Sequence, residues 1–401
     1  MPANLLCIKN FNKIAITDYK GKMSIISNLL ADKQWFIVFL IFVVAIIIQL
    51  IYYLGIYLRF VLFKPKNISR SVEPVSVIIC ARNEAENLEQ YLPAILTQDY
   101  PDYEVILVDD CSTDDTDMVM KRYLAKYPRL RTSVIREDKK FSHGKKLAVT
   151  IGIKAAKFDH LLFIDADCQP ESDQWLRLMT EQFSDKISII LGYGGYFPIP
   201  GILNKYIRFD TMMIALQYFS FALSRMPYMG VGRNLAYKRT LFYKGKGFAS
   251  HYHLASGDDD LFVNEHATKS NTAIVCSRES HTRSAPKQSF DRWSFQKKRH
   301  FSTAKLYKPF HKIMLGMEPV SRLLFYSSFV IMMFYGPLRM IVLAAFVVRL
   351  IIQLTVIKKT MSRLNEKNLL VISLLFDLFS LFINIGLYLS SQFRPANYQW
   401  K

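Results

Sequence analysis

The chain has 401 residues, of which 51% are hydrophobic and only 21% are charged. This composition excludes a disordered chain and a small disulfide scaffold, and the length allows two or three domains. Lys and Arg number 52 against 33 Asp and Glu, so the formal net charge is +19. Such a charge suits an anionic membrane surface, nucleic acid or a phosphorylated substrate, and the charge alone does not distinguish them.

A long apolar segment lies near the N-terminus, since residues 35–58 include no charged residue. A helix needs roughly 20 apolar residues to cross the hydrocarbon core of a bilayer. A cleaved signal peptide has a shorter apolar core followed by small residues, whereas Arg59, Lys64 and Lys66 follow here. We therefore expect a tail at 1–34 and a retained transmembrane helix at 35–63.

Three further apolar segments lie near the C-terminus. Residues 323–338 are uncharged, 340–357 contain only Arg349, and 368–393 contain only Asp377. They predict about three membrane helices within 323–393, and residues 394–401 form a tail. The first two segments, separated by a Gly-Pro break at 336–337, form either two full spans or a re-entrant pair. Each of the two charges either has a function within the membrane or faces protein or the headgroups.

The segment between these helices, residues 64–322, is long enough for one globular domain. Basic residues flank the membrane segments on its side, which favours the cytoplasm, although the N-terminal tail is also rich in Lys. The basic residues are Arg59, Lys64, Lys66, Arg70, Lys358, Lys359, Arg363 and Lys367. The five cysteines are odd in number and show no CxxC spacing, which fits a reduced compartment. We expect an integral protein of the cell (inner) membrane with this domain in the cytoplasm.

The domain opens with an alternation that is typical of parallel α/β sheets. Short β-branched runs are expected as strands at 75–80, 104–108, 132–135 and 161–164, and helical patterns occur at 85–96, 115–126 and 145–156. Sheets of this kind bind ligands beyond the carboxyl ends of their strands. The residues after each apolar run are therefore the candidates for a site.

Acidic residues follow three of these strands. They are Glu84 after the first strand, Asp109 and Asp110 after the second, and Asp165 and Asp167 after the fourth. One acidic strand end is often only a helix cap, and Ser112, Asp114 and Asp115 fit that reading. Two carboxylates one residue apart can hold a divalent cation that also binds diphosphate oxygens. The Asp165–Asp167 pair is a specific signal because it ends a fourth parallel strand.

Six motifs in this order resemble the inverting family 2 glycosyltransferases, which have the GT-A fold. They are VSVIICARNEAENL, VDDCSTDDT, SHGKKLAV, FIDAD, GDDDLF and QKKRH, and they cover most of residues 74–302. The resemblance extends to the membrane-embedded branch that includes hyaluronan, chitin and cellulose synthases. It implies a Rossmann-like nucleotide-diphospho-sugar transferase domain with flanking transmembrane helices.

The resemblance also implies roles for the residues that match the motifs. The nucleotide-sugar-binding residues would be Glu84, Asp109, Asp110, Lys145, Asp165, Gln296 and Arg299. Asp165 and Asp167 would hold Mg²⁺ or Mn²⁺ on the diphosphate. Asp259 would be the catalytic base, with Asp258 beside it in the same motif. Taken alone, residues 258–260 are better explained by an acidic helix cap, and QKKR by a solvated or lipid-facing basic face, but the place of 258–260 after the Asp165–Asp167 motif favours catalysis.

One departure from the family concerns the acceptor. The Trp that ends the family's QxxRW motif is replaced by His300, while Trp293 lies three residues before Gln296. Gly232 and Arg233 lie in a segment that resembles the acceptor-proximal loop of this branch, although a flexible turn explains that segment equally well. We expect these four positions, Gly232, Arg233, Trp293 and His300, on the acceptor side. The loss of the Trp puts processive synthesis in doubt.

Two stretches have the composition of interfacial helices. Residues 206–223 mix Met, Phe, Tyr and Leu with a few charges, and residues 293–312 combine aromatic and cationic side chains. The first stretch fits an internal core helix equally well. A catalytic cleft held at the lipid headgroups would suit a lipid-linked acceptor or a growing polysaccharide.

The motifs therefore favour an enzyme that moves a sugar from a nucleotide-diphosphate sugar, UDP-linked at the family level, to a membrane-associated acceptor. Such a reaction needs a stabilised leaving group, positive charge near its phosphates and a base for the acceptor hydroxyl. The alternative enzyme adds a single sugar to a lipid carrier. A nucleic-acid binder lacks support because no zinc-finger or RNP-like motif occurs. A transporter would need more spans.

Overall fold

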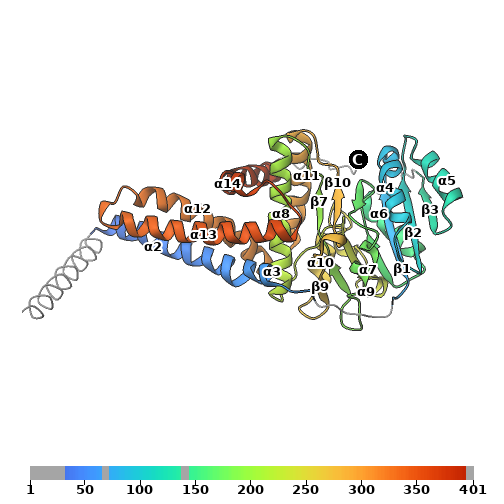
Figure 1. Cartoon of the computed structure of the whole chain (residues 1–401), viewed down its shortest axis with the longest axis horizontal. Coiled ribbons are helices and arrows are strands. Elements are labelled where there is room, and N and C mark those ends of the chain that lie inside the picture. Colours follow the sequence, from blue (N-terminus) through green and yellow to red (C-terminus); the bar gives the residue numbers. More distant parts are fainter. Residues whose placement is uncertain (1–31, 66–71, 137–143, 394–401) are drawn as a thin grey trace, which may run out of the picture. The chain divides into compact units, whose positions relative to one another are not determined.

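The computed structural model describes residues 32–65, 72–136 and 144–393 of the chain (Figure 1). Contacts divide the chain into two compact units, and each is described by itself. One unit comprises residues up to Gly55 together with Met314–Thr355, and the other comprises Ile56–Ile313 together with the chain from Val356. Most of the expected tail at 1–34, the tail at 394–401, Arg70 and the Ser142-His143 start of one motif lie outside the described residues.

The expected alternation of strands and helices is confirmed at the start of the second unit. Its elements are β1 (Val75–Ala81), α4 (Ala85–Leu96), β2 (Tyr103–Asp110), α5 (Thr116–Lys126), β3 (Leu130–Ile135), α6 (Lys145–Ala155) and β4 (His160–Phe163). The four strands pair in parallel in the order β3-β2-β1-β4. Figure 1 shows these elements in blue to green.

Both faces of this parallel sheet are covered, as the continuous apolar runs of its strands require. Side chains alternate between faces along a strand, so Val77 and Ile79 point to one side and Ile78 to the other. Val77 and Ile79 pack with Leu88 and Leu92 of α4 in one core cluster. Ile78 faces α6, where a Cβ built on Gly152 would lie 2.6 Å from its Cγ2. The glycine therefore permits a close approach of helix and sheet.

The sheet continues with short strands that the sequence did not reveal. β8 (Leu235–Lys238) pairs antiparallel with β4 and with β6 (Ile189–Leu191), and β9 (Thr272–Ile274) completes the seven strands. A second, three-stranded sheet has the order β5 (Cys168–Pro170), β10 (Thr282–Ser284) and β7 (Gly194–Tyr196). The result is a mixed α/β domain, as predicted.

The two stretches expected as interfacial helices form α8 (Ile202–Leu223) and α11 (Phe290–Thr303). Most of the first helix is buried, which fits the internal alternative, and its Phe219 stacks on Phe60 at 5.1 Å between ring centroids. The second helix is amphipathic, because Trp293 is buried whereas Phe295 is 45% exposed. It ends at Thr303, and α12 (Pro309–Met332) begins after a short 3-10 turn.

Three described helices are long and apolar enough to cross a membrane, judged by length and composition. They are Lys33–Leu62, Gly336–Arg363 and Leu370–Ser391. The first contains a π-helical stretch at Ile51–Tyr57. Of the segment expected as a helix at 323–338, residues 323–332 form the end of α12, which also carries the charged residues Glu318 and Arg322, and residues 336–338 form a short 3-10 helix. The choice between two spans and a re-entrant pair stays a prediction.

The charged residues inside the apolar segments face protein. Arg349 on α13 (Arg339–Arg363) is 1% exposed and donates hydrogen bonds to Gln49 Oε1 at 2.8 Å and to the Tyr326 hydroxyl at 3.2 Å. Its guanidinium also lies 5.4 Å from the ring centroid of Tyr53. Asp377 on α14 (Leu370–Phe393) is fully buried. Partners of this kind lower the cost of a charge in an apolar segment.

Candidate active site

The site lies at the carboxyl edge of the parallel strands, where the strand register brings acidic residues together. Asp109 pairs with Ala81, and Phe163 pairs with Ile78, so Asp165 follows β4 on the same edge. Leu235 of antiparallel β8 pairs with Phe163, which brings the residues just before β8 to this edge as well. Gly232 and Arg233 therefore join the acidic residues, although they are distant from them in sequence.

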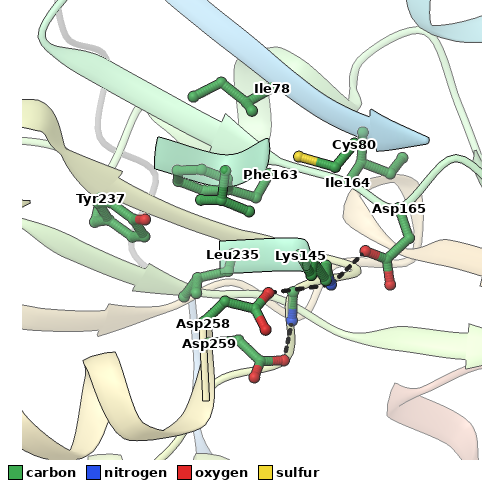
Figure 2. Close-up of a pocket in the computed structure, with 12 residues that line it drawn as sticks. Ile78, Cys80, Lys145, Phe163, Ile164, Asp165, Leu235, Tyr237, Asp258 and Asp259 are labelled. Carbon is green, nitrogen blue, oxygen red and sulfur yellow. Dashed lines mark hydrogen bonds and ion pairs between the residues drawn. The ribbon is translucent and has the colours of Figure 1, made fainter. Parts of the chain in front are cut away.

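Lys145 links two of these acidic groups. Its Nζ lies 2.8 Å from Asp165 Oδ1 and 3.1 Å from Asp258 Oδ2, as Figure 2 shows. Burial alone would lower the pKa of Lys145, but the carboxylates of Asp165 and Asp258 outweigh it and raise the pKa well above its usual value. Burial also opposes the ionisation of Asp165. The positive charge of Lys145 outweighs this effect, so the pKa of Asp165 is lowered. The lysine is therefore charged and acts as the counter-ion of both carboxylates.

Asp259 has a different environment from Asp258. Its Oδ2 accepts a hydrogen bond from the Gly232 backbone N–H at 2.7 Å, and its Oδ1 accepts one from the Asp260 N–H at 2.7 Å. Burial and the neighbouring carboxylates of Asp258 and Asp260 raise its pKa to about 7. A carboxylate with such a pKa exchanges a proton readily near neutral pH, as a general base requires.

The closeness of Gly232 to the aspartate depends on its missing side chain. A Cβ at this position would lie 3.2 Å from Lys145 Nζ and 3.3 Å from Asp259 Oδ2. A larger residue would therefore displace one of these two polar groups. Gly232 also lines a small cavity with Lys145, Asp165, Asp258 and Asp259, and the rest of its lining is mainly apolar (Figure 2).

Asp260 faces away from this cluster into the protein. Its Oδ2 accepts hydrogen bonds from the hydroxyls of Thr303 and Tyr307, the latter at 2.8 Å. Its Oδ1 accepts the Leu261 N–H at 2.8 Å, at the start of α10 (Asp260–His266). Burial raises the pKa of Asp260. The three consecutive aspartates thus divide into an ion-paired one, a base candidate and a structural one.

Asp165 and Asp167 meet the chemical requirements of a divalent cation site. One carboxylate oxygen of each lies within 4.8 Å of the other and of Cys168 Sγ. Burial raises the pKa of Cys168 well above its usual value, so this thiol remains protonated and is a poor metal ligand. Two adjacent carboxylates without a thiolate are the donor set that Mg²⁺ and Mn²⁺ prefer.

Three of the expected nucleotide-binding residues, Glu84, Asp109 and Asp110, lie in or next to two loops that brace each other. Asn83 Oδ1 accepts the Thr113 N–H at 2.8 Å, and the Asn83 N–H donates to Ser112 Oγ at 2.9 Å. Asp114 accepts the N–H of Ala85 at 3.2 Å, so a residue that follows β2 also stabilises the start of α4. The cap expected of Asp114 therefore serves both its own helix, through Thr116, and the neighbouring one.

The acidic side chains of these loops are already engaged in hydrogen bonds. Asp109 Oδ1 accepts hydrogen bonds from the Ser112 N–H, at 3.2 Å, and from the Ser112 hydroxyl. Glu84 accepts a hydrogen bond from the Asn87 side chain. Asp110 is fully buried, 4.0 Å from Arg82 Nη1. The structure therefore places all three expected residues at the edge of the sheet, with defined side-chain positions.

Cationic groups surround the Asp165–Asp167 turn. The Arg233 guanidinium lies 4.4 Å from the ring centroid of Tyr196, and its Nη1 donates to the Gly195 carbonyl at 3.3 Å. The charges of Arg233 and Arg299 contribute, after Lys145, to the lowered pKa of Asp165. Gln296 Nε2 donates to the Tyr196 hydroxyl at 3.3 Å, which links α11 to β7. The two motif residues of α11 thus belong to the same region.

Trp293 and His300 differ in their surroundings. The Trp293 ring is 3% exposed and packs between Tyr206 and Phe290, at centroid distances of 5.3 and 5.4 Å. It joins α11 to α8 and presents no free face to a ligand. His300 is exposed. Of the four residues expected on the acceptor side, Gly232 and Arg233 lie with the acidic cluster and Trp293 does not.

Several residues of the site were not expected from the sequence. Tyr196 supports Arg233, and Lys146 donates to the carbonyls of His251 and Leu254 at 2.5 and 2.6 Å. Burial lowers the pKa of Lys146 to about 8. Lys145 and Lys146 thus hold the chain before Asp259 at two points. Adjacency to Lys145 was the available signal for Lys146, whereas Tyr196 carried none because its partners are distant in sequence.

Comparisons with known proteins agree with this geometry. Residues 76–245 match the family model described as Glycosyl transferase family 2. Glycosyltransferase AglE of Haloferax volcanii is 38% identical over 139 residues, which cover 34% of this chain and 44% of that protein. Poly-beta-1,6-N-acetyl-D-glucosamine synthase of Staphylococcus epidermidis is 28% identical over 126 residues, 30% of this chain and 29% of that protein. The chain therefore spans less than half the length of these relatives.

A solved structure shares the fold over most of the chain. The mannosyltransferase PcManGT of Pyrobaculum calidifontis, in complex with GDP-Man and Mn²⁺, superposes with a TM-score of 0.54 at 20% sequence identity. The match covers 86% of this chain and 98% of the mannosyltransferase chain. At this identity the likeness concerns the fold, which is Rossmann-like and of the GT-A type.

Proposed function

Because the chain contains a family 2 glycosyltransferase domain with the GT-A fold, we propose that it transfers a sugar, with inversion, from a nucleotide-diphosphate sugar to a membrane-associated acceptor. The donor is UDP-linked, and the acceptor is a lipid-linked sugar or a growing polysaccharide. The observation that carries the proposal is the contact of Lys145 with both Asp165 and Asp258, beside Asp259. This arrangement sets a cation, a metal-binding carboxylate and a base next to one another.

Each residue has a defined task in this reaction. Asp259, with its pKa of about 7, accepts the proton of the acceptor hydroxyl as that oxygen forms the new glycosidic bond. Lys145, Arg233 and Arg299 supply positive charge to the phosphates as the bond from sugar to diphosphate breaks. Asp165 and Asp167 would hold Mg²⁺ or Mn²⁺, which stabilises the negative charge of the leaving diphosphate. The mannosyltransferase with the same fold was solved with Mn²⁺.

The donor and the product are tested together with membranes that contain the full chain. We expect one labelled nucleotide sugar from a panel to be incorporated into a lipid-soluble or polymeric product, and an Asp167→Ala variant of similar abundance to incorporate none. Full incorporation by Asp167→Ala in excess chelator would contradict the metal site. A wild-type chain that neither transfers nor hydrolyses any donor would contradict the activity.

A non-processive transferase is the second candidate. His300 replaces the family's Trp, and Trp293 is buried against Tyr206, so neither of these two positions supplies the expected stacking surface. Such an enzyme would add one sugar to a lipid carrier. The length of the labelled product distinguishes the two: a ladder of sizes supports synthesis of a polysaccharide, and a single species supports one addition.

The proposal also requires the domain at 64–322 to face the cytoplasm, because nucleotide sugars are too polar to cross the bilayer. A variant without native cysteines, carrying one new cysteine at Asp114, tests this in intact cells with an impermeant thiol reagent. We expect no labelling until the cells are broken. Cysteines placed at Asn4 and Asn397 are expected to react in intact cells, and labelling at position 114 would exclude the proposed orientation.

A further inference from the structure

A buried ionic cluster lies on the side of the second unit that carries the loop between α13 and α14. It consists of Glu171, Tyr193, Arg208, Arg283 and Glu366, and we call it the Glu366 cluster. Glu366, whose side chain is fully buried, accepts hydrogen bonds from the Tyr193 hydroxyl at 2.9 Å and from Arg208 Nε at 2.8 Å. Arg283 Nη1 donates to Oε1 of Glu366, the oxygen that also accepts the Tyr193 hydroxyl, whereas Arg208 contacts Oε2.

The two arginines hold the loop backbone as well as the carboxylate. Arg283 Nη2 donates to the carbonyls of Leu364 and Asn365 at 3.0 and 3.3 Å, and Arg208 Nη2 donates to the carbonyl of Lys367 at 3.1 Å. The guanidinium groups therefore fix the loop on both sides of Glu366. A planar fork with several donors is suited to such a task, and a lysine would not replace it.

The charges of the cluster balance. Arg283 Nε also donates to Glu171, so within the cluster two arginines face two carboxylates; the exposed Arg278 lies 3.8 Å from Glu171 at its edge. Burial of charges is costly, and apolar residues of similar volume often stabilise a protein as well or better. The cluster therefore fits a role in fixing the position of the loop relative to the sheet. Hydrogen-bonded ionic groups define such a position more strictly than apolar contacts do.

The cluster is connected to the site through the small sheet. Arg283 lies on β10, the central strand, which pairs with β5 on one side and β7 on the other. β5 follows the metal-binding turn directly, since the Cys168 N–H donates to the Asp165 carbonyl at 3.1 Å. Next to Arg283, Thr282 Oγ1 donates to the Arg233 carbonyl at 2.9 Å. A shift of β10 would therefore move both the Asp165–Asp167 turn and Arg233.

Gly195 on β7 shows how closely these parts fit. A Cβ at this position would lie 2.3 Å from Arg283 Nη1, so no other residue leaves room for the guanidinium. The Gly195 carbonyl meanwhile accepts the hydrogen bond from Arg233. One residue thus contacts the cluster on one side and a cation of the site on the other.

We infer that Glu366 is a positioning residue: it ties the loop between two candidate membrane helices to the small sheet and so sets the positions of Asp167 and Arg233. This inference deepens the proposed function, and its expected effect on the kinetics of transfer rests on that function. Its structural consequence is independent of any reaction.

The test compares three variants of the full chain. Glu366→Gln keeps the shape but removes the charge that both arginines face, and Glu366→Asp keeps the charge. Glu104→Gln is the matched control. Glu104 is also a buried carboxylate and accepts hydrogen bonds from the Ser76 hydroxyl at 2.7 Å and from Arg131 Nη1 at 2.8 Å, but it lies near the start of β2. Both Gln variants are expected to lower the thermal stability.

The readout that separates position from stability is hydrogen exchange, followed on peptides that cover 165–170 and 194–196. Glu366→Gln is expected to raise exchange there by roughly tenfold or more, Glu366→Asp by less, and Glu104→Gln not at all. Unchanged exchange in Glu366→Gln, or an equal rise in Glu104→Gln, would overturn the inference. Should Glu366→Gln fail to fold, Glu366→Asp carries the same test.

The kinetic readout tests the link to the reaction. In Glu366→Gln the Mn²⁺ concentration for half-maximal transfer is expected to rise roughly 10–100-fold, as for other residues that orient metal ligands, whereas Glu104→Gln keeps the wild-type value. Glu366→Asp is expected to recover part of the loss. Raised exchange at 165–170 together with an inactive wild type would contradict the proposed function and leave the positioning role standing.

Discussion

The two halves of the α/β unit are stabilised in different ways. Residues 75–164 form a sheet with an apolar core on both faces, and the ion pairs on its helices, such as Arg122–Glu89, lie at the surface. Residues 165–313 instead bury ionic and polar groups, among them the pair Lys297–Asp210 at 2.7 Å. The exposed ion pairs on the helices of the first half should therefore tolerate the loss of a charge, whereas the buried pairs of the second half should not. The comparison yields four predictions, from the largest expected effect to the smallest.

The largest effect is expected for Asp259→Asn, in the second half. The amide keeps the size of the carboxylate but cannot accept the acceptor's proton, so transfer should fall by roughly 10²–10⁴-fold while the donor still binds. Single-turnover transfer and donor binding, measured on the same preparation, test this. Lost donor binding with normal residual transfer would make Asp259 a binding residue and direct attention to Asp258.

The pH dependence sharpens the same assignment. The pKa of Asp259 is raised to about 7, so the fraction of free base falls below that pH. Transfer by the wild type is expected to rise with pH through about 7 and to fall about tenfold per unit at lower pH. The residual rate of Asp259→Asn should lack this limb. A limb of the same midpoint in the variant would assign it to another group.

Asp260, the buried second-half neighbour of Asp259, should also affect stability. Asp260→Ala leaves the Tyr307 hydroxyl without its acceptor and leaves the Thr303 hydroxyl only the His300 carbonyl, so the free energy of unfolding should fall by about 1–3 kcal/mol. Denaturant unfolding of the purified chain measures it. A loss below about 0.5 kcal/mol would show that the buried polar groups of this half contribute less than we infer.

In the first half, packing should dominate. Gly152→Ala places a methyl group 2.6 Å from Ile78 Cγ2 and should lower the free energy of unfolding by about 1–3 kcal/mol without a change in the donor's KM. By contrast, Asp117→Ala breaks an exposed ion pair with Lys121 and should cost only about 0.2–0.5 kcal/mol. Equal costs for these two variants would remove the contrast between packing and surface charge.

The two halves also differ in how closely the sequence predicted their secondary structure. The strands and helices of residues 75–164 were predicted closely because periodicity and strand ends are local signals. The strands of the small sheet have three residues each, and their pairing joins 168–170 to 282–284, which no local pattern encodes. The start of α12 at Pro309 was not predicted either, because it lies in a charged stretch.

The candidate site divides in the same manner. Lys145, Asp165, Asp258, Asp259 and Gly232 were all expected, and the structure brings them together. Their supports were not foreseen, since the role of Asp260 depends on hydroxyls more than forty positions away in the chain. Trp293 was expected to face an acceptor, yet its ring packs against the buried Tyr206 on α8. Amphipathic composition alone does not identify which apolar face of a helix is buried.

The mutual bracing of the loops after β1 and β2 has a consequence for engineering. Each loop supplies hydrogen-bond partners to the other, through Asn83 with Thr113 and Asp114 with Ala85. Neither loop can therefore be exchanged alone without removing hydrogen-bond partners from the other. A graft of residues 82–85 from a relative would disrupt the turn after Asp110 unless residues 111–116 came with it. The two loops therefore form one structural unit that is encoded by two separate segments of the sequence.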